Sequence, residues 1–224
     1  MDWMQTVDGY CERVASGFWG EPFNTLTGLA FLGVGLAAFA RGPFGDDRRA
    51  AAALVLVGVA SAAQHGFSVV LVVWTDIAAN LLYLVLLGVL LLRRLAGAGA
   101  VASVFAALSA VAVVNQMLQS VGIRTAFGIW ADMFVVLMLV LFGAALAMRA
   151  RHPATACRIA LAAAVLAGGL PFRFLDGGLC DIWPLGTHGI WHLVNATSAA
   201  LLLSALARHT PDRPRALAEQ GEGR

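Results

Sequence analysis

Five side chains in this 224-residue sequence combine types that can bind a metal ion and hydrolyse a bond: Ser61, His65, Asp76, His188 and His192. Residues four apart share a helix face, so Ser61 lies beside His65, and His188 beside His192. Three imidazoles are a natural zinc site, because catalytic zinc takes three protein ligands and one water. Zinc lowers the pKa of that water to about 7. Asp76 is suited to move the proton, and Ser61 to donate a hydrogen bond to a carbonyl oxygen.

Taken singly, these residues also have structural explanations. A lone His65 is more often a core histidine bonded to a carbonyl group, and a lone Ser61 more often joins two packed helices. His188 and His192 can form an interfacial pair near a helix start. The combination of all five side chains is what favours a metal-dependent enzyme.

The composition indicates that lipid is the solvent for most of the chain. Hydrophobic residues make up 60% of the sequence and charged residues 12%, and the mean hydropathy is +0.80. Soluble domains contain roughly 45–50% apolar and about 25% charged residues. These values exclude a cytosolic, secreted or disordered protein. The net charge of +2, without a basic stripe, excludes nucleic-acid binding.

The apolar runs predict an all-α membrane protein, a bundle of seven transmembrane helices without a second domain. The expected spans are residues 23–41, 50–72, 77–93, 99–118, 126–148, 158–175 and 187–207. Residues 1–22 carry four acids and one arginine, which is unlike a secretory signal, and are expected to be an extracytoplasmic segment. The transmembrane domain is expected over 23–207, and residues 208–224 are expected to be a disordered cytoplasmic tail.

The arginines predict the orientation of the bundle. All 15 positively charged residues are arginine, and seven spans place three on the side of the amino terminus and twelve on the other. The positive-inside rule puts the twelve in the cytoplasm, so the amino terminus faces outward and the carboxyl terminus inward. His65, Asp76, His188 and His192 then lie at one outer level, which predicts a site toward the extracytoplasmic side.

Several other outer residues have open roles at this stage. Asp132 and Arg173 are both unassigned. Either can line the pocket or support a ligand, and Arg173 can instead form an ion pair with Asp176. Cys11 and Cys180 both fall on the outer side, where a disulfide can persist. Topology alone leaves open whether they pair or are two unrelated thiols.

The combination of motifs resembles the alkaline ceramidases, members of a seven-span hydrolase superfamily that includes the adiponectin-receptor-like proteins. The matching segments are residues 61–65 (Ser-Ala-Ala-Gln-His), Asp76 eleven residues later, and residues 188–192 (His-Gly-Ile-Trp-His). Residues 8–12 (Asp-Gly-Tyr-Cys-Glu) with 21–25 (Glu-Pro-Phe-Asn-Thr) resemble the entry to the first span, and residues 176–180 (Asp-Gly-Gly-Leu-Cys) the end of the sixth.

The resemblance implies zinc binding by three histidines, a proton-transferring aspartate and a serine that polarises the amide carbonyl. These are His65, His188 and His192 for zinc, then Asp76 and Ser61 for catalysis.

The resemblance also implies a calcium site and a disulfide outside the bundle. Asp8, Glu12 and Glu21 match the acids of the calcium site, which backbone carbonyls would complete, since Ca²⁺ prefers oxygen ligands. Without calcium, these acids would form a solvated outer face. Cys11 and Cys180 match the family's disulfide pair.

The expected function is an intramembrane zinc-dependent amidase that hydrolyses the N-acyl bond of ceramide-like lipids to a long-chain base and a fatty acid. Its partners are then membrane lipids, including the N-acyl lipid substrate. Arginine-only usage, high alanine content and compact loops favour a bacterial inner membrane. The alternative is a seven-transmembrane lipid receptor or sensor with a structural zinc site. A proton-relay transporter is disfavoured, because the sequence has no inverted repeat.

Overall fold

The computed structural model describes residues 2–13, 15, 17–42, 45–99, 101–104, 106, 108–109 and 129–209, apart from the side chains of 129–132. Its helices are α1 (Pro22–Arg41), α2 (Asp46–Phe67), α3 (Val70–Leu95), α5 (Ile129–Met148), α6 (Pro153–Phe174) and α7 (His188–Ala207), with a 3₁₀ turn η1 (Asp176–Gly178). The helices α1, α2, α3, α6 and α7 are long and apolar enough to cross a membrane, and Met133–Met148 in α5 is a shorter apolar helix. An all-α, multi-pass membrane protein is thus confirmed, and most of the fourth expected span, 99–118, lies outside the described residues.

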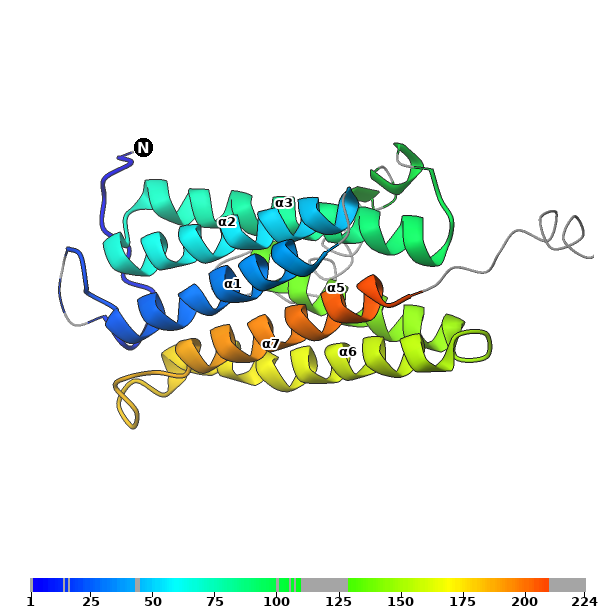
Figure 1. The fold of residues 1–224 in the computed structure, drawn as a ribbon. Helices are drawn as coiled ribbons and strands as arrows, with labels where there is room; N and C mark the ends of the chain where they lie inside the picture. Colours follow the sequence, from blue (N-terminus) through cyan, green and yellow to red (C-terminus); the bar gives the residue numbers. More distant parts are fainter. Residues whose placement is uncertain are drawn as a thin grey trace, which may run out of the picture.

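The described helices lie along a common long axis (Figure 1). Helix α1 packs between α2 and α7, α2 packs on α3, and α6 lies between α5 and α7. Close approach of α1 to α2 depends on Gly58, where a Cβ atom would lie 2.2 Å from the backbone nitrogen of Leu32. Small residues at such crossings let two membrane helices pack backbone to backbone.

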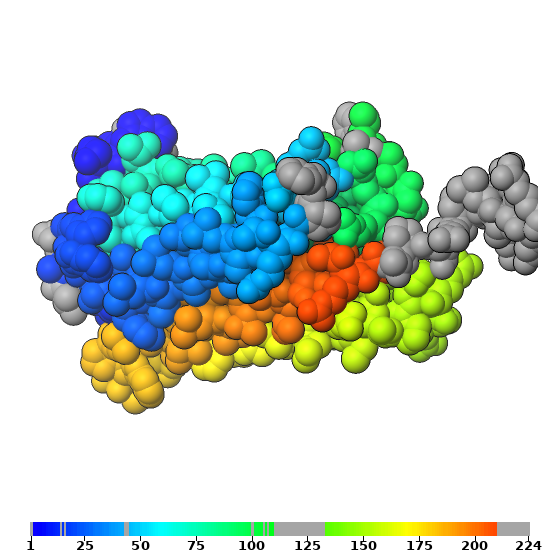
Figure 2. Space-filling model, viewed as in Figure 1, coloured from blue at the N-terminus to red at the C-terminus, as the bar shows by residue number. Residues whose placement is uncertain are grey.

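The outer faces of the helices carry large apolar side chains. Leu26 and Leu36 on α1 are more than half exposed, as are Leu139 and Leu146 on α5. Helices α1, α2 and α7 lie side by side on the face shown in Figure 2. Exposed apolar side chains of this kind suit contact with lipid. A soluble protein would bury most of them.

The structure corrects the boundary between the second and third expected spans. These spans, 50–72 and 77–93, are α2 and α3, and the chain turns between them at residues 68–69. Ser68 ends α2 in the left-handed region at φ 43°, and its hydroxyl donates to the Gln64 carbonyl at 3.0 Å. The apolar run continues across this turn, so hydropathy does not locate it. Asp76 therefore lies in the second turn of α3, not at its start.

Helix α6 also begins earlier than expected, at Pro153 instead of residue 158. Proline at the first position of a helix lacks only an N–H group that would have no helical partner. Arg151 and His152 therefore belong to the turn before α6, and Pro153 is the first residue of the helix.

Polar contacts close the two ends of the described bundle. At one end, ion pairs Arg93–Asp46 and Arg94–Asp47 join the end of α3 to the start of α2. At the other end, the N-terminal segment, residues 2–13, runs along the turn between α2 and α3. The N–H of Val7 donates to the Ser68 carbonyl at 2.8 Å, and this pairing brings the segment over the ends of the helices.

Candidate metal centre

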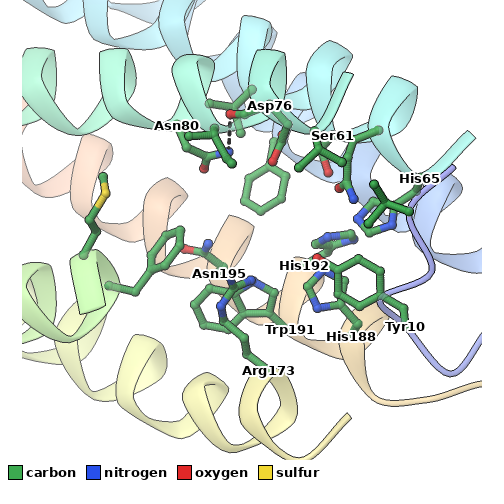
Figure 3. A pocket seen from close by; sticks show the side chains of 18 residues that line it. Tyr10, Ser61, His65, Asp76, Asn80, Arg173, His188, Trp191, His192 and Asn195 are labelled. Atoms are coloured by element: carbon green, nitrogen blue, oxygen red, sulfur yellow. Dashed lines mark hydrogen bonds between the residues drawn. The ribbon is translucent and has the colours of Figure 1, made fainter. Parts of the chain in front are cut away.

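Three buried histidines meet at the end of the bundle that the N-terminal segment covers. His65 lies in the last turn of α2, while His188 and His192 lie in the first two turns of α7. One nitrogen of each ring lies within 4.8 Å of those of the other two, close enough for a single ion. Figure 3 shows the rings facing one another beside a pocket. The sequence prediction that these side chains converge is confirmed.

Hydrogen bonds orient two of the three rings. Nδ1 of His65 lies 2.6 Å from Oε2 of Glu21, and a carboxylate can only accept, so Nδ1 donates. The Thr27 hydroxyl donates to the Phe23 carbonyl at 2.8 Å and accepts from Nδ1 of His192 at 3.1 Å. In the neutral form of each ring, Nε2 is then the nitrogen without a proton, as a metal ligand requires.

The third ring has a buried nitrogen without a partner. No described group bonds to Nδ1 of His188, although the side chain is 2% exposed. Leaving a buried polar atom unpaired is costly, and such atoms in native proteins call for an explanation. A metal ion held by the three rings fits this arrangement.

Asp176 fixes the start of α7 and therefore the position of His188. Its Oδ1 atom accepts the backbone N–H groups of Thr187 at 2.6 Å and His188 at 2.9 Å. A carboxylate at a helix N-terminus is favoured by the unpaired N–H groups and the helix dipole. Its Oδ2 atom accepts the N–H of Cys11 at 3.2 Å. Asp176 is thus not the ion-pair partner of Arg173 that the sequence left open.

The predicted disulfide between Cys11 and Cys180 is confirmed, with the two Cα atoms 4.9 Å apart. It holds the N-terminal segment beside the loop that follows η1. Tyr10, the preceding residue, lies over the histidines, with its ring centroid 4.0 Å from that of His188 and 4.9 Å from that of His65. Burial raises the pKa of Tyr10 to about 12, so its hydroxyl stays protonated at neutral pH. The sequence analysis missed Tyr10, although its position next to Cys11 was a signal.

Ser61 and Asp76 line the same pocket as the histidines (Figure 3). Ser61 lies one turn before His65 and is buried. Its hydroxyl fits because residue 28 is glycine: a Cβ atom there would lie 2.8 Å from the Ser61 oxygen. Oδ1 of Asp76 is buried and has no hydrogen-bond partner in the described part of the chain. Both residues that the sequence predicts to be catalytic thus line the same pocket as the three histidines.

The pocket has a volume of about 100 Å³ and adjoins a larger apolar cavity of about 500 Å³. The cavity lies between α3 and α5, and its lining includes Leu84, Gly88 and Ala144. Met133 lines both spaces. A polar site next to an apolar cavity suits a ligand with a polar head and a hydrocarbon chain.

The three acids expected to bind calcium have different surroundings. Asp8 is exposed, whereas Glu12 and Glu21 are buried. Glu12 accepts the N–H groups of Phe23 and Asn24 at the start of α1, and burial raises the pKa of Glu12. Among the described residues, only the three histidines form a group of three or more potential ligands within metal-binding distance. The described residues therefore do not include all three acids in one such group.

Glu21 is instead the centre of a hydrogen-bond network. Besides His65, it accepts the Arg13 guanidinium at 2.8 Å and the Ser68 hydroxyl at 3.1 Å. Burial raises the pKa of Glu21, but the bonds and charges of His65 and Arg13 outweigh this, and the pKa lies below its ordinary value. Calcium binding at this position stays a prediction, with an arginine already beside the carboxylate.

Comparison with known proteins does not assign the chain to a family, because no protein-family model and no curated protein matched it. Function is therefore inferred from the arrangement of the side chains.

Proposed function

We propose that this protein is an intramembrane zinc-dependent amidase that hydrolyses the N-acyl bond of ceramide-like lipids. The products are a long-chain base and a fatty acid. The observation that carries the proposal is the meeting of three buried histidines, a serine and a carboxylate at one pocket, with one carboxylate oxygen unpartnered among the described groups.

The residues that would hold zinc are His65, His188 and His192. Imidazole nitrogen suits Zn²⁺, and three protein ligands leave the fourth position open, as in catalytic zinc sites. When bound, zinc supplies a Lewis acid and lowers the pKa of a coordinated water to about 7.

Asp76 is the proposed general base and acid. Its unpartnered Oδ1 accepts a proton from the attacking water, whose oxygen forms a bond to the amide carbon. As the C–N bond breaks, the same carboxyl returns the proton to the leaving nitrogen. The other carboxylate oxygen of Asp76 stays available to accept a hydrogen bond that fixes the orientation of the side chain.

Ser61 is the proposed donor to the carbonyl oxygen. Negative charge develops there as water attacks, and a donor fixed in a dry site stabilises that charge strongly. Its buried position one turn from His65 puts the hydroxyl beside the metal ligands. Tyr10 covers the rings and limits the entry of bulk water.

The apolar cavity between α3 and α5 is the proposed site of the acyl chain. Met133 lines both the polar pocket and this cavity, so a chain bound in one reaches the other past its side chain. A purely structural zinc site, as in the receptor alternative, needs neither Ser61 nor Asp76 beside an open coordination position.

We propose that the histidine end faces the extracytoplasmic side of a bacterial inner membrane, in a bundle of seven spans. The Cys11–Cys180 disulfide supports this, because disulfides persist in oxidising compartments. Arg93 and Arg94 lie at the opposite end of the bundle, as the positive-inside rule expects for a cytoplasmic face. Residues 208–224 are then the cytoplasmic tail.

The test is hydrolysis of N-acyl lipids by the purified protein in detergent, before and after removal of zinc with a chelator. We expect activity to be lost on chelation and restored by zinc. His192→Ala should lose both metal and activity, whereas Asp76→Asn should lose activity but keep the metal. His152→Ala, at the other end of the bundle, is the control. A folded His192→Ala protein with full metal content and activity would overturn the proposal.

A further inference from the structure

Arg173 brings a positive charge to the wall of the pocket. It lies in the last turn of α6, and its guanidinium carbon is 5.7 Å from the ring centroids of both Phe134 and Trp191. Its Nε atom is buried and has no hydrogen-bond partner among the described groups. Two aromatic rings thus flank the guanidinium, and its Nε donor has no acceptor in the described part of the chain.

No described carboxylate forms an ion pair with this guanidinium. The ion pairs of the described chain join Glu21 to Arg13 and His65, Asp46 to Arg49 and Arg93, and Asp47 to Arg94. Asp176 is occupied by three backbone N–H groups. Asp76 lies across the pocket from Arg173 in Figure 3 and forms no ion pair with it within 4 Å.

A cation in such a position calls for an anionic ligand. An unpaired charge in a low-dielectric pocket is costly, and the planar guanidinium matches a carboxylate with two parallel hydrogen bonds. The head group of a simple ceramide offers only neutral hydroxyls, which do not need a cation. A substrate with a negative charge near the amide would pair with Arg173 and still place its acyl chain toward Met133.

We propose that the preferred substrates are N-acyl lipids with a carboxylate next to the amide nitrogen, the chemistry of N-acyl amino acids, and that Arg173 binds this carboxylate. This inference rests on the proposed amidase function and replaces its ceramide-like substrate with an anionic N-acyl lipid. Hydrolysis adds one water: a C–O bond forms at the acyl carbon, the C–N bond breaks, and the nitrogen receives the proton. The products are a fatty acid and a free amino acid.

The first arm of the test compares two substrates of nearly equal size, N-palmitoylglycine and N-palmitoylethanolamine. They differ in having a carboxylate or a hydroxymethyl group at the same place. We expect kcat/KM to favour N-palmitoylglycine by at least about tenfold, mainly through KM, as for a hydrogen bond to a charged group. Arg173→Met should remove this preference, so that kcat/KM no longer favours N-palmitoylglycine over N-palmitoylethanolamine, whereas Arg173→Lys should retain part of it. Arg158→Met, an exposed arginine of α6, is the matched control.

The second arm measures binding without chemistry. Hexadecyloxyacetate and 2-(hexadecyloxy)ethanol carry an ether in place of the amide, and calorimetry on metal-free protein gives their affinities. The anionic ether should bind at least about tenfold more tightly than the alcohol, and Arg173→Met should abolish the difference. Thermal unfolding and gel filtration in detergent establish that the variants are folded.

The two arms separate this inference from the proposed function. Hydrolysis of both amides at equal rates, unchanged by Arg173→Met, would overturn the inference and leave the amidase in place. Arg173-dependent binding of the anionic ether without hydrolysis of any amide would overturn the amidase, and with it the substrate role of the site. Arg173→Met could also weaken inhibition by palmitate and keep the preference for N-palmitoylglycine. Arg173 would then bind the carboxylate of the fatty-acid product, and the inference would be wrong.

Discussion

The Glu21 carboxylate accepts a hydrogen bond from Nδ1 of His65 at 2.6 Å, although the two residues are 44 positions apart. The bond fixes the tautomer that presents Nε2 to a metal ion, and the negative charge makes that nitrogen a better ligand. Arg13 and Ser68 hold the carboxylate from its other side. Glu21 is therefore a positioning residue for one zinc ligand.

Glu21→Gln should weaken zinc binding about 10–100-fold, the usual effect of losing a carboxylate behind a histidine ligand. A competition titration against a chromophoric zinc chelator measures this. Asp181→Asn, which removes an exposed acid from the loop before α7, is the control and should bind zinc as the native protein does. Unchanged affinity in a folded Glu21→Gln protein would show that the contact does not orient the ring.

Gly28→Ala should lower amidase activity through Ser61. The added methyl group would lie 2.8 Å from the Ser61 oxygen, so the hydroxyl must move from its place beside His65. Gly33→Ala, also on α1, meets no atom within 4 Å and is the matched control.

A double-mutant cycle separates this effect from general damage to packing. If Gly28→Ala acts by displacing the hydroxyl, it should cost little further activity in a Ser61→Ala background, because the two changes remove the same interaction. Equal losses in both backgrounds would mean that the glycine matters only for the approach of α1 to α2.

Ala144→Phe should shorten the acyl chain that the enzyme prefers. Ala144 lines the apolar cavity between α3 and α5, and a phenyl ring there fills space proposed for the hydrocarbon chain. Hydrolysis of a series of N-acyl lipids of increasing chain length gives the preference. Leu139→Phe, on the exposed face of the same helix, should leave the profile unchanged. An unaltered profile for Ala144→Phe would place the acyl chain elsewhere.

Breaking the disulfide should destabilise the folded protein by about 2–5 kcal/mol, the range for a native bridge that closes a long loop. Cys11→Ser and Cys180→Ser should lower the Tm by similar amounts, and a reductant should have the same effect on the native protein. Cys157→Ser, which alters a free and exposed cysteine, should not. Insensitivity of the native Tm to reductant, with the bridge shown by mass analysis to be broken, would contradict this.

Calcium removal should change the Tm little, in contrast to zinc removal. The Arg13 guanidinium already bonds to Glu21, and Glu12 accepts two backbone N–H groups, so neither carboxylate is free for an ion. Thermal unfolding with a calcium-selective chelator and with added CaCl₂ measures the effect. A large Tm increase on adding calcium would show that the ion displaces Arg13 and that the site expected from the resemblance forms.

The convergence of the three histidines could be predicted, because helical spacing pairs some of the side chains of the site. Ser61 with His65, and His188 with His192, share a face whichever way the helices pack. Their common depth followed from the positions of the apolar runs. The turn at Ser68 could not be located from hydropathy, because apolar residues continue on both sides of it.

The surroundings of the site depend on chain segments without periodicity. Asp176 reaches Cys11 because the N-terminal segment folds back over the helix ends. Glu21, directly before α1, reaches His65 because α1 packs on α2. No spacing in the sequence reports such contacts between distant loops. Arg173 was visible as an intramembrane charge, but its two aromatic neighbours come from α5 and α7 and required the structure.

The bridge from Cys11 to Cys180 also sets an order of assembly during synthesis. The two cysteines are 169 residues apart in the sequence. Cys11 therefore cannot form the bridge until the loop before α7, which carries Cys180, has been synthesised. His188 and His192 follow within that last helix, and Tyr10 can settle over the rings only afterwards. A nascent chain stopped before α7 therefore holds one of the three metal ligands and has no closed site. The proposed binding of zinc and the closure of the bridge would then both be late steps, which require the whole bundle to be complete.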